Sequence, residues 1–208
     1  MDITITITII VSYLFGSIPN AYLVARSFGV RDLRTEGSRN IGARNAYEVT
    51  TNKAIGIAVL VLDMFKGLIP IIFLVVQKRI DLIPIAIAAI VLGHCYSIWI
   101  RFHGGRGLAT AAAITAVCAP VLLPAWALFY FLCSIIRKNV HFQALIATFA
   151  VLILELVLYE DSTTGIYSIL HWNVDELQIL HYGIVVILLI IISRHVNPVS
   201  EYLKTSPL

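Results

Sequence analysis

Charged residues are scarce in this 208-residue chain: Asp, Glu, Lys and Arg make up 13% of it, whereas 59% is hydrophobic. A soluble domain usually carries about 25% charged residues, so this shortage excludes an ordinary water-soluble globule. The apolar residues also fall in long runs, and a run of about 20 spans the hydrocarbon core of a bilayer. The composition therefore predicts an integral membrane protein.

Cysteine is rare as well. The three cysteines lie in or beside apolar segments, and their spacing fits neither a disulfide framework nor a zinc site. We expect no metal and no cofactor. Met1 and Asp2 lead into the first apolar run without a basic region, so we also expect no cleavable signal peptide.

The apolar runs predict an all-α fold with about seven transmembrane helices in one polytopic membrane domain, residues 1–208. The first run begins with alternating Ile and Thr, which is typical of a strand, but it continues well past strand length and favours a helix. The region 108–136 is either one long kinked span or two short spans divided near Pro120 and Pro124. The predicted segments are Ile3–Ala25, Ala54–Val76, Leu82–Ile100, Leu108–Ala119, Val121–Ile136, Gln143–Tyr159 and Ile179–Ser193.

The distribution of basic residues favours two short spans in that region. Cytoplasmic loops carry an excess of Lys and Arg. With two spans, 12 of the 15 Lys and Arg share one side, and the opposite side receives the acidic stretch Glu160–Gln178. With one span the bias nearly vanishes. We therefore expect the N-terminus outside, the C-terminus in the cytoplasm, and the protein in the plasma membrane.

The first polar cluster is the cytoplasmic loop from Gly37 to Asn45. Its glycines and asparagines allow tight backbone geometry, and its arginines offer forked donors suited to phosphate. An ordinary basic loop is the alternative interpretation. The candidate binding residues are Gly37, Ser38, Asn40, Gly42, Arg44 and Asn45.

The second cluster runs from His103 to Gly107, directly before an apolar helix-forming run. Glycines that expose backbone N–H groups at a helix N-terminus, with a cation among them, favour anion binding. A tight interhelical turn is the alternative. The candidate residues are Gly104, Gly105, Arg106, Gly107 and Thr110.

Two further sets of polar residues lie in or near the spans. Asp63 and Lys66 share a helix face three residues apart, and Gly67 allows another helix to approach closely. Ionisable groups at membrane depth usually face a partner or a wet cavity, although a purely structural ion pair is the alternative. His94, His195 and Asn197 lie near the same cytoplasmic surface, where they serve as site residues, packing residues or interfacial anchors.

With these motifs in this order, the chain resembles the bacterial membrane acyl-phosphate:glycerol-3-phosphate acyltransferases, the PlsY family. The resemblance rests on Gly16-Ser17-Ile18-Pro19, Gly37 to Asn45, Asp63-x-x-Lys66-Gly67, and Gly93-His94 through Thr110. It implies seven spans, a cytoplasmic active site, and transfer of a fatty acyl group from acyl phosphate to the 1-hydroxyl of glycerol 3-phosphate. The product would be lysophosphatidic acid for phospholipid synthesis, and we expect a monomer.

The chain departs from the family pattern at several positions. Arg39 and Arg44 stand where the family has Gly and Thr, and Glu48 stands where it has a phosphate-binding Arg. Arg44 lies four residues before Glu48, so on a helix it would supply the lost cation from the same face and pair with Glu48. The later motifs match poorly, with His141 and Ala144 at the two serine positions and Ser200 at the last arginine.

Acyl phosphate is an activated donor, so placing the hydroxyl and neutralising phosphate charge supply most of the rate effect. On this hypothesis Ser38, Asn40 and Arg44 hold one phosphate, and the Gly104–Gly107 amides with Arg106 hold the other. The candidate catalytic residues are Ser38, His94, Arg106, His195 and Asn197, with Asp63, Lys66 and Gly67 as support. Two alternatives stay open: a divergent paralogue for another phosphorylated acceptor, and a small organic-anion transporter.

Overall fold

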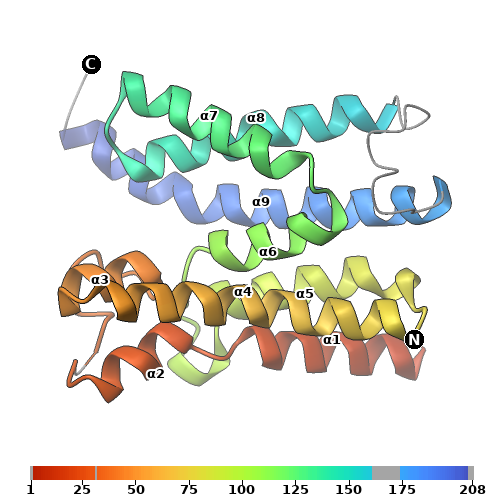
Figure 1. Cartoon of the computed structure of the whole chain (residues 1–208), viewed down its shortest axis with the longest axis horizontal. Helices are drawn as coiled ribbons and strands as arrows, with labels where there is room; N and C mark the ends of the chain where they lie inside the picture. The colour runs from red at the N-terminus through yellow and green to blue at the C-terminus, as the bar shows by residue number, and fades with distance from the viewer. Residues whose placement is uncertain (1, 31, 161–173, 206–208) are drawn as a thin grey trace. The chain divides into compact units, whose positions relative to one another are not determined.

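The computed structural model describes residues 2–30, 32–160 and 174–205, and within these ranges every regular element is a helix (Figure 1). The chain divides into two compact units, Met1–Ile114 and Thr115–Leu208, which are treated separately below. The prediction of an all-helical protein is confirmed for the described residues. Leu208 and most of the acidic stretch Glu160–Gln178 lie outside them.

The first unit is built around three helices, Ile3–Gly16, Lys53–Val76 and Ile83–Cys95. Residues 17–52, which include two shorter helices, connect the first two, and residues 77–82 connect the last two. Asp2 caps the first helix by accepting the N–H of Thr4 at 3.0 Å. That helix ends before Pro19, because the residue preceding a proline is pushed out of the helical region. The elements are α1 (Ile3–Gly16), α2 (Asn20–Ser27), α3 (Ala43–Thr50), α4 (Lys53–Val76), η1 (Ile80–Leu82), α5 (Ile83–Cys95), η2 (Ile98–Ile100) and the start of α6 (Leu108–Cys118).

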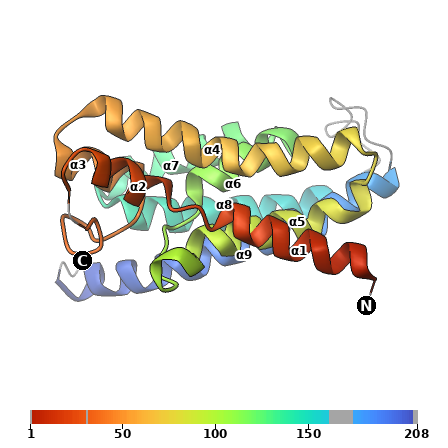
Figure 2. The same ribbon diagram turned by 90° about the horizontal axis from the view of Figure 1, so that it is seen from below.

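Helices α1 and α5 lie side by side, as Figures 1 and 2 show. Two glycines permit this close contact: a Cβ on Gly16 would overlap the carbonyl of Ile90, and one on Gly93 would overlap the carbonyl of Tyr13. Small residues at such crossings are typical of helix pairs in membranes, where close backbone packing replaces the hydrophobic driving force. This crossing fixes the position of the C-terminal end of α5, where His94 lies.

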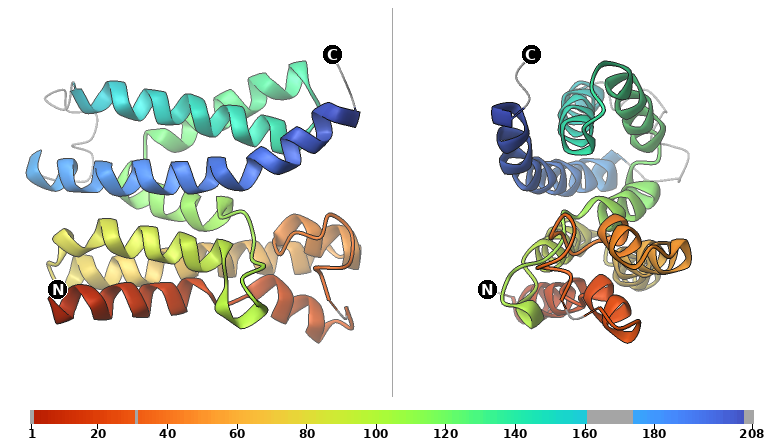
Figure 3. Two further views of the ribbon diagram at one scale, coloured as in Figure 1. Left: turned by 180° about the vertical axis from the view of Figure 1, so that it is seen from behind. Right: turned by 90° about the vertical axis from the view of Figure 1, so that its left-hand side faces the viewer.

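The second unit contains α7 (Leu122–Ile136), α8 (Val140–Glu160) and α9 (Val174–Thr205), with α7 packed on α8 and α8 on α9 (Figure 3). The indole N–H of Trp126 in α7 donates to the hydroxyl of Thr148 in α8 at 3.0 Å. The guanidinium of Arg137 lies over the ring of Tyr202, 5.9 Å from its centroid. The turn between α7 and α8 therefore lies at the C-terminal end of α9.

Within the described residues, five helical segments are long and apolar enough to cross a membrane: Ile3–Ser27, Lys53–Val76, Ile80–Ile100, Val140–Tyr159 and Asp175–Lys204. Two shorter apolar helices, Leu108–Cys118 and Leu122–Ile136, match the predicted fourth and fifth segments. Large apolar side chains along these helices are exposed, among them Phe73 at 61% and Phe131 at 62%. Side chains of this kind need lipid rather than water, so the chain is an integral membrane protein.

Candidate functional site

The loop before α3 is held in shape by the buried side chain of Asn45. Its Oδ1 accepts the N–H of Ser38 at 2.8 Å, and its Nδ2 donates to the carbonyls of Leu33 and Glu36, each at 3.2 Å. Gly37 adopts a φ of +57°, and a Cβ there would overlap this amide. Asn45 therefore shapes the loop, and its predicted contact with phosphate stays a prediction.

The remaining predicted residues of this loop lie nearer the surface. Ser38 is exposed, whereas Asn40 and Gly42 are half-buried. A Cβ on Gly42 would lie 2.9 Å from Nδ2 of Asn40, so the glycine leaves room for the asparagine amide beside the first turn of α3. The hydroxyl of Ser38 and the amide of Asn40 are thus displayed on one short stretch of chain.

Arg44 and Glu48 form the ion pair that their spacing predicts. Nε of Arg44 lies 2.7 Å from Oε1 of Glu48, with 60% and 39% of the two side chains exposed. Since an exposed pair of this kind contributes less than about 1 kcal/mol, it matters for local charge more than for stability. The Glu48 carboxylate offsets the Arg44 cation beside the loop.

A second pair lies in the same region, just before the loop. The guanidinium of Arg34 bonds to Asp32 at 2.6 Å and donates to the carbonyl of Ile100 at 3.3 Å. This hydrogen-bonded guanidinium lowers the pKa of Asp32 below its usual range. The contact with Ile100 ties the loop that follows α2 to the turn that precedes Gly104.

The glycine turn before α6 is pinned to the end of α5. The N–H of Gly104 donates to the carbonyl of Cys95 at 3.2 Å, and that of Gly105 donates to the carbonyl of His94 at 3.0 Å. This corrects the prediction that these two amides face a phosphate, because the turn pairs with α5 instead. Arg106 is half-buried, Gly107 has a φ of +84°, and α6 begins directly afterwards.

The two predicted loops meet at Gly105. A Cβ on Gly105 would overlap Nε2 of His94 and lie 2.5 Å from the carbonyl oxygen of Ile41. The Cα of Gly105 is therefore held between α5 and the loop that carries Ser38 and Asn40. The structure thus brings together the two motifs that the sequence places 60 residues apart.

A buried polar network lies beneath this junction. Oδ1 of Asp63 lies 3.0 Å from Nζ of Lys66, which also donates to the carbonyl of Ile18 at 2.9 Å. Asn20 donates to the same carboxylate oxygen at 3.1 Å. Sequence reasoning missed Asn20, although its place directly after Pro19, in a motif that already stood out, was a usable signal. The predicted ion pair is present, and it has a third member.

Thr110 links this network to His94. Its hydroxyl lies 3.0 Å from the carbonyl oxygen of Asp63 and 3.2 Å from Nδ1 of His94. If its one proton goes to the carbonyl, His94 must donate from Nδ1, which fixes the imidazole tautomer. Gly67 leaves room for this contact, because a Cβ there would lie 2.7 Å from the carbonyl of Thr110. Thr110 is fully buried, and its predicted phosphate contact stays a prediction.

A small cavity joins the network to the glycine turn. Its lining includes polar groups from α2, α4 and α5 together with the two buried glycines; these residues are Asn20, Asp63, Lys66, His94, Gly104 and Gly105. The ionisable residues of α4 are therefore directly next to the candidate site. This position is consistent with the prediction that Asp63 and Lys66 support the site.

The remaining predicted residues belong to the second unit. His195 is buried, with Nδ1 2.8 Å from the carbonyl of Ile191 and its ring centroid 6.0 Å from that of His141. Asn197 and Ser200 are exposed on the following turn of α9, and Ala144 is fully buried. This unit therefore gathers two histidines and Asn197 near one end of α9.

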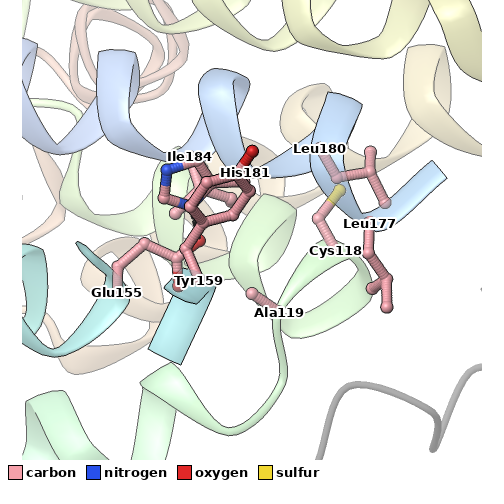
Figure 4. A pocket seen from close by; sticks show the side chains of 8 residues that line it. All are labelled: Cys118, Ala119, Glu155, Tyr159, Leu177, Leu180, His181 and Ile184. Carbon is pink, nitrogen blue, oxygen red and sulfur yellow. Dashed lines mark hydrogen bonds and ion pairs between the residues drawn. The ribbon is translucent and has the colours of Figure 1, made fainter. Parts of the chain in front are cut away.

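The second unit also holds a buried ionisable pair that sequence reasoning did not single out. Oε1 of Glu155 lies 3.0 Å from Nδ1 of His181, and the ring of Tyr159 stacks on the imidazole at 4.0 Å (Figure 4). The cavity beside them has a volume of about 20 Å³, enough for one water. His181 lies 14 residues before His195, about 21 Å along a helix. We interpret the Glu155–His181 pair as a contact that holds α8 and α9 together.

Comparisons with known proteins are consistent throughout. A family model described as glycerol-3-phosphate acyltransferase matches residues 6–205. The glycerol-3-phosphate acyltransferase of Campylobacter concisus is 32% identical over 203 residues, covering 93% of each chain. That of Geotalea daltonii is 42% identical over 130 residues, covering 60% of this chain and 64% of the relative. That of Syntrophotalea carbinolica is 39% identical over 128 residues, covering 59% of this chain and 64% of the relative. The last two matches therefore span under two thirds of the relatives' own length.

Solved structures agree with the family match. The crystal structure of PlsY (YgiH), an integral membrane glycerol 3-phosphate acyltransferase, in its glycerol 3-phosphate form superposes with a TM-score of 0.76 and 28% identity. The lysophosphatidic acid form gives 0.75 and 27%. Both cover 97% of this chain and 93% of the other.

Proposed function

The chain belongs to the glycerol-3-phosphate acyltransferase family, and from this premise we propose that it transfers a fatty acyl group from acyl phosphate to the 1-hydroxyl of glycerol 3-phosphate. The product is lysophosphatidic acid, the first acylated intermediate on the way to a phospholipid. The observation that carries the proposal is the meeting at Gly105 of the Ser38 loop and the turn that bears Arg106. The relatives named for glycerol 3-phosphate, and the solved neighbour's glycerol 3-phosphate form, support this acceptor.

In the proposed reaction the C1 oxygen of glycerol 3-phosphate attacks the carbonyl carbon of the acyl phosphate. The bond between that carbon and the bridging phosphate oxygen breaks, and inorganic phosphate leaves. The hydroxyl proton passes to the departing phosphate or through a histidine. His94 and His195 are the candidate histidines for this transfer. Nδ1 of His195 donates to the carbonyl of Ile191, and Nε2 of His94 lies beside Gly105.

Arg106 and the start of α6 are the proposed binding site for one phosphate. The amides of Gly104 and Gly105 are bonded to α5, so the first turn of α6 takes over their predicted role, where the helix dipole favours an anion. Ser38 and Asn40 belong to the loop whose Ile41 carbonyl lies beside Gly105, and they are the proposed hydroxyl and amide groups for the second phosphate. Asn197 and His195 are the candidate contribution of α9.

We expect Arg106→Ala to lower kcat/KM by roughly 10- to 100-fold. This range corresponds to the loss of one charge-assisted hydrogen bond of about 1.5–3 kcal/mol. Arg106→Lys retains the charge without the fork and should keep intermediate activity. Steady-state phosphate release by purified protein measures both. Wild-type kinetics in the Ala variant would mean that Arg106 only shapes the turn.

The membrane arrangement that we propose has seven apolar segments, of which the fourth is too short for a full-thickness span. The N-terminus lies outside, the C-terminus in the cytoplasm and the acyl-transfer site on the cytoplasmic side of the plasma membrane. The concentration of Lys and Arg supports it. Reporter fusions before Met1 and after Leu208 should report opposite sides. A C-terminus on the outside would contradict two separate crossings between Leu108 and Ile136.

One assay tests the function against its alternatives. Purified protein should release inorganic phosphate from acyl phosphate when glycerol 3-phosphate is present, with an equal amount of lysophosphatidic acid formed. A paralogue with another acceptor would release phosphate only with that acceptor. A transporter would move the anion across vesicles without cleaving acyl phosphate.

A further inference from the structure

The segment Gly37–Asn45 carries two arginines, Arg39 in the loop before α3 and Arg44 in the first turn of α3, and the structure distinguishes them by their surroundings. Nε of Arg44 lies 2.7 Å from Glu48, so its charge is offset locally. Arg39 is exposed, and its guanidinium makes no hydrogen bond or ion pair with any residue that the structure describes. The uncompensated cation of this loop is therefore Arg39.

Arg39 also sits in an unfavourable backbone conformation, with a φ of +59°. Glycine adopts this left-handed region without strain, whereas other residues lose about 1–2 kcal/mol. Positive φ recurs at Thr51, Lys78, Arg101 and Phe102, so the strain alone assigns no function. It does mean that a side chain at position 39 is retained against a backbone preference for glycine.

The position of Arg39 adds the third observation. Two residues later, the carbonyl of Ile41 contacts Gly105, next to Arg106 at the start of α6. An arginine side chain at 39 is thus anchored within a few residues of the junction between the two loops. Its exposed side chain is accessible to a ligand.

We propose that Arg39, rather than Arg44, supplies the guanidinium that binds the phosphate of glycerol 3-phosphate in this chain. The inference rests on the proposed function and specifies one residue of its acceptor site. Glu48 stands where related enzymes have a cation, and its carboxylate also forms an ion pair with Arg44. Arg39 restores the positive charge from a position five residues earlier than Arg44 and is a determinant of acceptor affinity.

The decisive variants are Arg39→Gly and Arg39→Lys. The glycine variant removes the cation and relieves the backbone, so it should fold at least as well as the wild type, which its thermal midpoint checks. Its KM for glycerol 3-phosphate should rise about tenfold or more. Its kcat should change less than about threefold, and its KM for acyl phosphate should stay the same. Lysine at 39 should recover most of the affinity because it keeps the charge.

Lys78 provides a matched control. It is another exposed cation at positive φ, 55°. It follows the C-terminal end of α4, a helix about 36 Å long whose N-terminal end is the one next to α3 and its loop. Lys78→Gly removes the same charge and relieves the same kind of backbone, and it should leave every kinetic constant unchanged. Arg44→Ala should raise the KM for glycerol 3-phosphate by only about two- to threefold, through the exposed charge of Glu48.

The outcomes separate this inference from the proposed function. A wild-type protein that releases no phosphate with glycerol 3-phosphate overturns the function itself. An active wild type whose KM is unaffected by Arg39→Gly but rises about tenfold in Arg44→Ala overturns the assignment to Arg39 and gives the role to Arg44. Equal effects of Arg39→Gly and Lys78→Gly would reduce Arg39 to a contribution to overall charge.

Discussion

Replacing Gly105 by alanine should lower the rate of acyl transfer by about 100-fold or more. The new Cβ would overlap Nε2 of His94 and lie 2.5 Å from the carbonyl of Ile41, and neither neighbour moves easily. His94 is buried on α5, and the Ile41 carbonyl belongs to backbone. The Ser38 loop and the Arg106 turn must therefore separate, and a displacement of about 1 Å at a positioned site costs about 100-fold. Steady-state phosphate release measures the loss.

Gly29→Ala is the matched control. Gly29 lies in the connection between α2 and α3, the connection that also carries Ser38. Nothing lies within 4 Å of a Cβ built on Gly29. Its φ of +89° makes alanine strained, so some stability should be lost while the kinetic constants stay near wild type. If Gly105→Ala were as active as Gly29→Ala, the contact at Gly105 would not position the site.

The sequence predicted the helices better than the details of the site. Long apolar runs have one solution in lipid, because backbone groups must bond within the helix, so even the Ile-Thr alternation of α1 became helical. The break between α6 and α7 followed from the distribution of charge. The Arg44–Glu48 pair followed from helical spacing alone.

What the sequence could not provide was the direction of individual polar groups. Glycine amides before a helix are typical of an anion site, yet those of Gly104 and Gly105 bond to the end of α5. Asn45 resembled a ligand-binding residue, and the sequence did not show that its side chain also holds its own loop. The interaction of Asn20 with Asp63 spans 43 residues and depends on how α2 meets α4. The place of Asn20 after Pro19 marked the residue, but it did not show this partner.

The buried network beneath the site gives the second large effect. Asp63 and Lys66 are 2% and 5% exposed, and Asp63 also lies 3.8 Å from Nδ1 of His94. Asp63→Leu leaves Lys66 as an uncompensated buried cation, which should cost about 3–5 kcal/mol of unfolding free energy. Activity should fall with it, since Asp63 and Thr110 orient the histidine that supports Gly105. Thermal unfolding in detergent measures the first effect and phosphate release the second.

A double variant separates support of the fold from support of the site. Asp63→Leu with Lys66→Met removes both charges, and replacing a buried ion pair by apolar residues of similar size is often close to neutral. The loss of the hydrogen bond from Lys66 to Ile18 should leave a residual cost of about 1 kcal/mol. We expect stability to return while kcat stays at least about tenfold low, because His94 has lost the Asp63 carboxylate that lies 3.8 Å from its Nδ1. Full recovery of kcat would show that the pair serves only the packing of α4.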